Sequence, residues 1–192
     1  MKFSSYWHET SQGFDGAGSL PAQADVVVIG GGFTGLAAAR RLALAGRSVV
    51  VLEARHVGFG ASGRNGGHLN NGLAHSYLAA REAFGPEKAG AMYRAFDTGI
   101  ETVRRLIAEE EIDCDFRIAG KLKLASKPQH MEGLSRNFEA IHREVDPETE
   151  LLSKADLSRE IGSDIFHGAM LSKKSAMMHM GRFGAGLADA AR

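Results

Sequence analysis

A glycine turn between two short apolar runs constrains this chain more than any other feature. Residues 26–29 are all apolar. They lead through the glycine-rich residues 30–35 into an Ala/Leu-rich segment that ends at Gly46. A second apolar run, residues 49–52, ends at Glu53. Continuous apolar runs are typical of strands buried on both faces, and Ala and Leu favour helix. We therefore expect strand, turn, helix and parallel strand, joined as a right-handed crossover.

The three glycines of the turn have the spacing of a dinucleotide-binding motif. Gly30, Gly32 and Gly35 fit G-x-G-x-x-G, in which the first permits a tight turn, the second admits a pyrophosphate and the third allows close helix packing. The N-terminus of the helix offers N–H groups to phosphate. Glu53 stands where a carboxylate accepts hydrogen bonds from ribose hydroxyls and disfavours a 2′-phosphate. No Lys-Ser/Thr pair follows the glycines, which excludes a P-loop.

A second glycine loop follows Glu53 directly and favours FAD over a nicotinamide. The run Gly58–His68 holds small residues whose N–H groups can reach the flavin ring. Ser62, Arg64 and Asn65 are candidates to bind pyrophosphate or ribityl oxygens. The alternative interpretation of this run is a flexible glycine loop without a ligand. His68 could lie near the flavin ring, but a polar side chain that is hydrogen-bonded to the backbone is an equally good interpretation. The further candidate cofactor-binding residues are Phe33, Thr34, Ala54, Arg55, Gly63, Gly66 and Gly67.

The rest of the chain alternates amphipathic helices with short strands. Apolar residues at steps of three and four predict helices over 86–110 and 131–145. We also expect strands around Gly120. The remaining expected elements are a short helix over 153–161 with Ser153 as its N-cap, a strand over 165–171 and a helix over 183–191.

Composition excludes several classes of protein. The 192 residues carry 23 basic and 23 acidic side chains, so charge gives no argument for a nucleic-acid partner. The one cysteine, Cys114, cannot form an intrachain disulfide, and we expect it to be buried. Scattered histidines give no metal site. Without an apolar stretch of signal-peptide or membrane-span length, the chain is expected to be cytoplasmic.

Several segments resemble the FAD-dependent oxidoreductases of the D-amino acid oxidase (DAO) type. The resemblance rests on both glycine runs, Ser5-Tyr6-Trp7, Ile112-Asp113-Cys114-Asp115-Phe116 and Gly168-Ala169-Met170-Leu171. It implies an α/β fold in which a Rossmann-like FAD-binding domain is followed by the start of a mixed α+β substrate domain. Residues 1–24 are polar with scattered glycines, and we expect them to form an N-terminal arm held by Tyr6 and Trp7. For the rest of the chain, the resemblance implies an FAD-binding domain (25–75 and 172–192), connecting helices (76–111) and a partial substrate domain (112–171).

The resemblance also implies a reaction, in which an amine is oxidised to an imine by hydride transfer to flavin N5, and the imine hydrolyses to an aldehyde. Arg64 stands where some relatives attach the flavin through histidine, so non-covalent FAD is expected. Because relatives continue beyond Arg192, we expect an N-terminal fragment whose catalytic residues and oligomeric state are unknown. Two alternatives stay open, namely a nucleotide-binding module inactive as this fragment and an NAD-dependent dehydrogenase.

Overall fold

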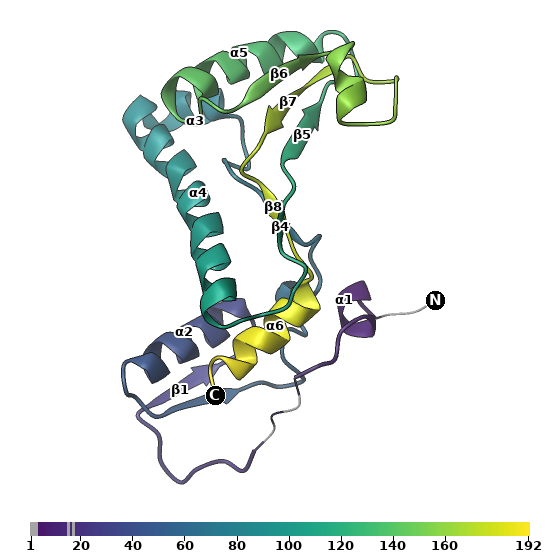
Figure 1. Ribbon diagram of the computed structural model, residues 1–192. Coiled ribbons are helices and arrows are strands. Elements are labelled where there is room, and N and C mark those ends of the chain that lie inside the picture. The colour runs from purple at the N-terminus through teal and green to yellow at the C-terminus, as the bar shows by residue number, and fades with distance from the viewer. Residues whose placement is uncertain (1–3, 15, 17) are drawn as a thin grey trace. The chain divides into compact units, whose positions relative to one another are not determined.

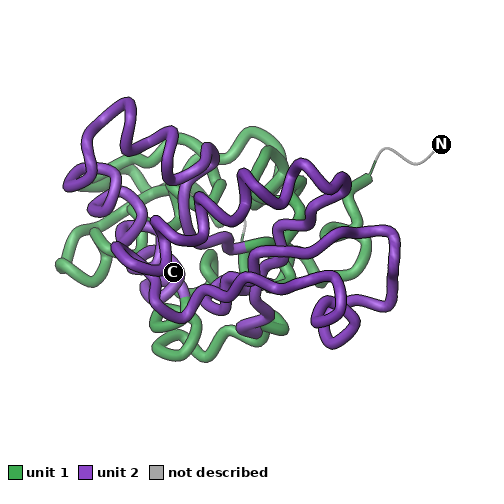
Figure 2. Tube along the Cα trace, turned by 90° about the horizontal axis from the view of Figure 1, so that it is seen from above, with its two compact units in different colours: residues 1–68, 104–116, 178–192 green, residues 69–103, 117–177 purple. Residues whose placement is uncertain are grey.

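The computed structural model describes residues 4–14, 16 and 18–192 (Figure 1). The chain forms two compact units, each assembled from segments that are distant in sequence (Figure 2). Unit 1 comprises residues 1–68, 104–116 and 178–192, and unit 2 comprises residues 69–103 and 117–177. Both glycine loops therefore lie in unit 1.

The predicted crossover forms the centre of unit 1. Strands β1 (Val26–Ile29) and β2 (Val49–Leu52) pair in parallel, with Val26 opposite Val49. Helix α2 (Phe33–Leu44) connects them. The prediction of strand, turn, helix and parallel strand is thus confirmed.

The end of α2 shows why the chain can turn back towards β2. Gly46 has φ +76°, which a residue with a Cβ rarely adopts. Its N–H donates to Ala43 O at 2.8 Å, and the N–H of Arg47 donates to Leu42 O at 3.1 Å. These two bonds form a Schellman motif, so Gly46 ends the helix as the sequence predicts.

The two strands are not buried on both faces, contrary to expectation. Val27 and Ile29 of β1 are 54% and 88% exposed, whereas Val26 and Val28 are half-buried. Side chains alternate between the faces of a strand, and α2 packs against both strands. A two-stranded sheet with its helix on one side leaves the other apolar face open.

A second helix packs against α2 in unit 1. Helix α6 (Met180–Asp189) contacts α2, and the rings of Phe33 and Phe183 meet edge to face with centroids 5.2 Å apart. Leu36 and Leu187 are buried. Unit 1 also holds α1 (Tyr6–Glu9) and the short 3₁₀ helix η1 (Ala61–Gly63).

Unit 2 is built on an antiparallel sheet whose strand order is β5-β7-β6. These strands are β5 (Lys121–Leu124), β7 (Gly168–Ser172) and β6 (Glu150–Ser153). Helix α5 (His130–Glu144) packs on β6 and β7, and α3 (Tyr77–Phe84) packs on α5. Residues 86–103 of α4 (Pro86–Glu109) also belong to this unit. The remaining strands are β3 (His68–Leu69), β4 (Arg117–Ile118) and β8 (Ala176–Met177), of which β4 and β8 pair antiparallel.

One predicted helix is wrong in its extent. Ser153 ends β6, and only Asp156–Arg159 form a helix, the 3₁₀ turn η2. The predicted cap itself is present, since Ser153 Oγ accepts from the Asp156 N–H at 3.2 Å. Pairing of Glu150–Ser153 with β7 overrides the local helical pattern. The expected strand over 165–171 begins later, at Gly168, and Ile165 is 68% exposed.

Candidate functional site

The first glycine turn has a backbone that requires glycine at two of its three motif positions. Gly30 has φ +107°, and its N–H donates to Leu52 O at 2.8 Å, which fixes the turn to the end of β2. A Cβ at Gly35 would overlap the carbonyl oxygen of Gly30 and lie 3.2 Å from Val28 Cγ1. Gly35 therefore allows α2 to start directly against the strand that precedes it.

The second motif glycine lies where the two glycine loops meet. Gly32 is the N-cap of α2 and offers no side-chain cap. A Cβ built on it would be 3.0 Å from Ser62 Oγ. The N–H of Phe33 donates to that hydroxyl at 3.0 Å. Ser62 thus contacts the N-terminus of α2, the end of the helix that attracts anions.

Glu53 joins the end of β2 to the same turn. Its Oε2 accepts from the Gly31 N–H at 2.7 Å, and its Oε1 accepts from the Arg55 N–H at 2.9 Å. The hydrogen bond from Gly31, and to a smaller extent that from Arg55, lowers the pKa of the Glu53 carboxyl. The group is therefore ionised at neutral pH and held beside the glycine turn.

Backbone and side-chain bonds order the second glycine loop. The Gly58 N–H donates to Gly31 O at 3.0 Å, which ties this loop to the first turn. The side chain of Asn65 donates to Ala61 O and Ser62 O at 3.2 and 2.9 Å and accepts from the Gly67 N–H at 2.9 Å. Asn65 thus closes the turn formed by η1.

The predicted site residues divide into two groups. Five of them meet around the N-terminus of α2 through the contacts above, namely Gly30, Gly32, Gly35, Glu53 and Ser62. Arg64 lies elsewhere: its Nε donates to Phe59 O at 2.9 Å, and its guanidinium lies 4.4 Å from the centroid of the Phe59 ring. Arg55 covers the same ring at 4.5 Å, and His68 is exposed at the start of β3. The other predicted residues, Phe33, Thr34, Ala54, Gly63, Gly66 and Gly67, lie along the same two loops.

Sequence reasoning missed three arm and helix contacts with this site. Trp7, His8 and His179 all lie against the second glycine loop or the start of α6. The aromatic pair Tyr6-Trp7 in an otherwise polar arm was the available signal. It predicted that these residues hold the arm in place, but not which residues they contact. These contacts join residues far apart in sequence, which no local pattern encodes.

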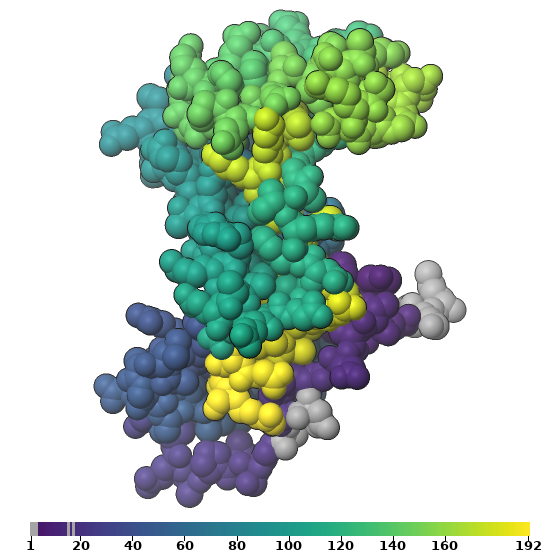
Figure 3. Space-filling model, viewed as in Figure 1, coloured from purple at the N-terminus to yellow at the C-terminus, as the bar shows by residue number. Residues whose placement is uncertain are grey.

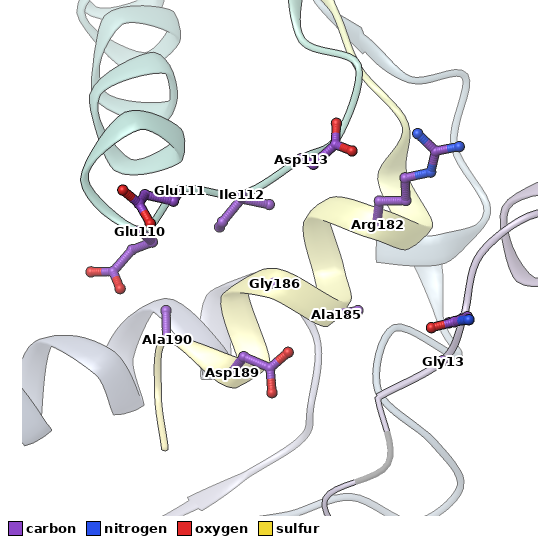
Figure 4. A pocket seen from close by; sticks show the side chains of 11 residues that line it. Gly13, Glu110, Glu111, Ile112, Asp113, Arg182, Ala185, Gly186, Asp189 and Ala190 are labelled. Atoms are coloured by element: carbon purple, nitrogen blue, oxygen red, sulfur yellow. The ribbon is translucent and has the colours of Figure 1, made fainter.

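A separate cavity of about 650 Å³ lies along α6 (Figure 4). Its walls carry acidic side chains from the segment after α4 and from α6, among them Glu110 and Asp189, together with Arg182. Glu110 already pairs with Arg40, and Arg182 pairs with Asp115 at 2.9 Å. Since neither glycine loop lines this cavity, we do not place a cofactor there.

Three further features concern metals, the cysteine and membranes. Within the described part of the chain, no group of three His, Cys, Asp or Glu side chains is arranged to hold a metal ion. Cys114 is 1% exposed, as predicted, and burial raises the pKa of its thiol to about 11. Among the described helices, none combines the length and apolarity that a membrane span requires.

Comparison with known proteins places the chain in a family. Residues 25–192 match the DAO family, described as FAD dependent oxidoreductase. The chain belongs to the DAO family. This membership favours FAD over the nicotinamide that the first glycine turn also allows. The Rossmann-like α/β fold with a mixed α+β second part, predicted from the sequence, is confirmed by the match with solved structures of this fold.

The DAO relatives are longer than this chain. The chain is 39% identical over 168 residues to gamma-glutamylputrescine oxidoreductase of Escherichia coli K12, a match that covers 88% of this chain and 39% of that protein. It is 35% identical to the probable oxidoreductase OrdL of Haemophilus influenzae, over 87% of this chain and 39% of the relative. The chain therefore spans about 39% of the length of these two relatives.

Solved structures share the fold at low sequence identity. An L-amino acid deaminase from Proteus vulgaris superposes with a TM-score of 0.71 at 21% identity, covering 96% of this chain and 46% of the other. A glycine oxidase from Geobacillus kaustophilus gives 0.66 at 24% identity, covering 88% and 44%. At these identities the likeness concerns the fold alone.

Proposed function

We propose that this chain forms the FAD-binding part of an oxidoreductase that oxidises the C–N bond of a small amine. One observation carries the proposal: at the start of α2, Glu53 accepts from the Gly31 N–H and Ser62 accepts from the Phe33 N–H, while the N-cap residue Gly32 has no side chain of its own. The space that a Cβ on Gly32 would fill gives a phosphate access to that end of α2. These residues fit the ADP half of FAD.

Glu53 and the two glycine loops receive separate roles in this proposal. Glu53 accepts hydrogen bonds from ribose hydroxyls, and the first turn of α2 binds the pyrophosphate. The second glycine loop contacts the flavin half. FAD bound here would accept a hydride from the substrate carbon next to the amine nitrogen. The protein's own contribution is to hold and orient that group.

The substrate class rests on the relatives. The name of the E. coli relative indicates gamma-glutamylputrescine, and the titles of two structural neighbours indicate amino acids. We propose a gamma-glutamylputrescine-like amine or an amino acid, oxidised to an imine that hydrolyses to an aldehyde or keto product. We also retain as proposals the division into an FAD-binding domain (25–75 and 172–192) and a partial substrate domain (112–171). Cytoplasmic location stays a prediction.

Binding of FAD is the direct test. The purified chain is titrated with FAD, following flavin fluorescence and the absorbance near 450 nm, and in parallel with NADH, following the fluorescence of the reduced nicotinamide. Saturable binding of FAD with no binding of NADH is expected. Saturable NADH binding without affinity for FAD would instead favour the NAD-dependent dehydrogenase. After acid precipitation the flavin should appear in the supernatant, because Arg64 provides no covalent attachment.

A second candidate function is a nucleotide-binding module without turnover. This candidate concerns the 192 residues themselves, which span 39% of the E. coli relative. Incubation of the FAD-loaded chain with gamma-glutamylputrescine, followed by a peroxide assay and by dye reduction under argon, separates the two. Steady turnover by either readout would refute the module without turnover.

A further inference from the structure

The N-terminal arm packs directly on glycines of the cofactor-binding region. In the space-filling view the purple arm lies against yellow atoms of the C-terminal segment, and α1 contacts α6 (Figure 3). A Cβ on Gly63 would lie 2.6 Å from His8 Nε2, and one on Gly67 would lie 3.0 Å from Trp7 Cζ2. A Cβ on Gly181 would lie 2.5 Å from Trp7 O. Arm residues thus occupy space that side chains at three glycines would need.

Trp7 makes the most direct of these contacts. Its indole Nε1–H donates to the carbonyl oxygen of Asn65 at 2.7 Å, across 58 positions of sequence. Asn65 is the residue whose side chain closes the η1 turn and accepts from the Gly67 N–H. The indole therefore holds the backbone of Asn65 while the side chain of Asn65 orders the loop around it.

His179 connects the same indole to helix α6. The rings of Trp7 and His179 meet edge to face with centroids 4.9 Å apart, and His179 is 7% exposed. His179 Nδ1 accepts from the Arg182 N–H at 3.3 Å, as the N-cap of α6. Its Nε2 lies 2.9 Å from Thr10 Oγ1, which itself donates to Tyr6 O at 2.7 Å. This pattern assigns the proton of His179 to Nε2, where it donates to Thr10.

We infer that Trp7 is a positioning residue for the cofactor: it fixes residues 65–68, beyond the contact of Ser62 with α2, in the conformation that contacts the flavin half of FAD. The inference rests on the proposed function. It differs from the role of the first glycine turn, which holds the ADP half. Loss of the indole N–H should therefore loosen the second glycine loop and weaken FAD while leaving ADP affinity unchanged.

The test compares two aromatic substitutions in the arm. Trp7→Phe removes the indole donor and keeps an aromatic ring, and Tyr6→Phe is the matched control at a side chain that is 67% exposed. Amide hydrogen exchange of residues 61–68 is measured without FAD, and dissociation constants are measured for FAD and for ADP. Far-UV circular dichroism and a melting curve verify that each variant is folded.

We expect Trp7→Phe to accelerate exchange of the Gly67 amide and to weaken FAD about fivefold, the usual worth of one hydrogen bond, with ADP affinity unchanged. Thr10→Val, which removes the acceptor of the His179 proton, should act in the same direction, and Tyr6→Phe should change neither quantity. The inference is overturned if Trp7→Phe has the amide exchange rates and the FAD affinity of the parent. It is also overturned if the affinities for FAD and for ADP fall equally. If the parent binds no FAD, the proposed function fails, and the exchange data alone decide whether Trp7 fixes the loop.

Discussion

The carboxylate of Glu53 accepts a hydrogen bond from the backbone N–H of Gly31 at 2.7 Å. This bond joins the residue after β2 to the middle of the turn after β1, and it sets the acid beside the N-terminus of α2. Glu53→Ala removes an acceptor for Gly31 and for the ribose hydroxyls. A hydrogen bond to a charged group contributes about 1.5–3 kcal/mol, so FAD affinity should fall roughly tenfold to hundredfold.

Fluorescence titration with FAD measures that loss, and Glu53→Gln serves as the comparison because its amide oxygen retains one neutral acceptor. The affinity of Glu53→Gln should lie between those of the parent and Glu53→Ala. Unchanged affinity in Glu53→Ala would show that this carboxylate does not contact the ribose.

Gly32→Val should abolish detectable FAD binding. A Cβ at Gly32 lies 3.0 Å from Ser62 Oγ, and the two further methyl groups of valine occupy the approach to the N-terminus of α2. The pyrophosphate then cannot reach the N–H groups of that helix end. Fluorescence titration with FAD measures the binding by Gly32→Val, and a melting curve verifies that the variant is folded. Equal FAD affinity in a folded Gly32→Val protein would show that the turn is not the site.

Gly35→Ala should destabilise unit 1 without any ligand present. The added Cβ overlaps the carbonyl oxygen of Gly30, so α2 must move away from β1, at a cost of about 2 kcal/mol. Gly60→Ala is the control, because no heavy atom lies within 4 Å of its Cβ and Gly60 has φ −78°. Urea unfolding followed by the fluorescence of Trp7 reports on unit 1. Equal midpoints for the two variants would contradict the close approach at Gly35.

Cys114 should react slowly with thiol reagents in the native chain. Its thiol is 1% exposed, and its pKa of about 11 leaves little thiolate at pH 8. Labelling with a chromogenic disulfide reagent should be slow in buffer and complete within minutes in denaturant. Rapid labelling of the folded chain would mean that the segment around Cys114 opens readily, and it would predict fast exchange of the His179 amide, which donates to Cys114 O at 2.7 Å.

The arm should loosen as the pH falls below neutrality. Burial and the nearby His56 lower the pKa of His8 from its ordinary value of 6.5. A lowered histidine pKa means that the unfolded arm binds the proton more readily. The stabilisation that neutral His8 provides is therefore complete above pH 6.5 and is lost as the pH falls through the folded-state pKa.

Trp7 is the chain's one tryptophan, so its emission reports the arm directly. The emission should shift to longer wavelength between pH 7.5 and 5 in the parent, with a smaller shift in His8→Gln. His56 and Arg64 also face His8, and His179 faces Trp7, so the His8→Gln curve provides the baseline. Identical curves for parent and variant would assign the transition to one of those groups instead.

Sequence patterns predicted the parts of unit 1 whose conformation is local. The glycine spacing, the apolar runs and Gly46 each determine backbone geometry within a few residues, so β1, α2 and β2 could be placed closely. Local pattern was insufficient where pairing with a distant segment overrides it. Glu150–Ser153 joins β7 as an edge strand, and the open face of β1 depends on which layers cover the sheet.

The sequence by itself determined the family, the glycine turn and the acid that follows β2, because each depends on residue type at fixed short spacing. Only the tertiary structure decided which groups meet there: Ser62 at the N-terminus of α2, Arg64 on the Phe59 ring, and Trp7 on Asn65. These contacts join segments up to 58 positions apart, and Thr10 and His179 meet across 169. Such bonds form only after the chain has folded back on itself, when the gain from burial and hydrogen bonding offsets the entropy lost in closing long loops.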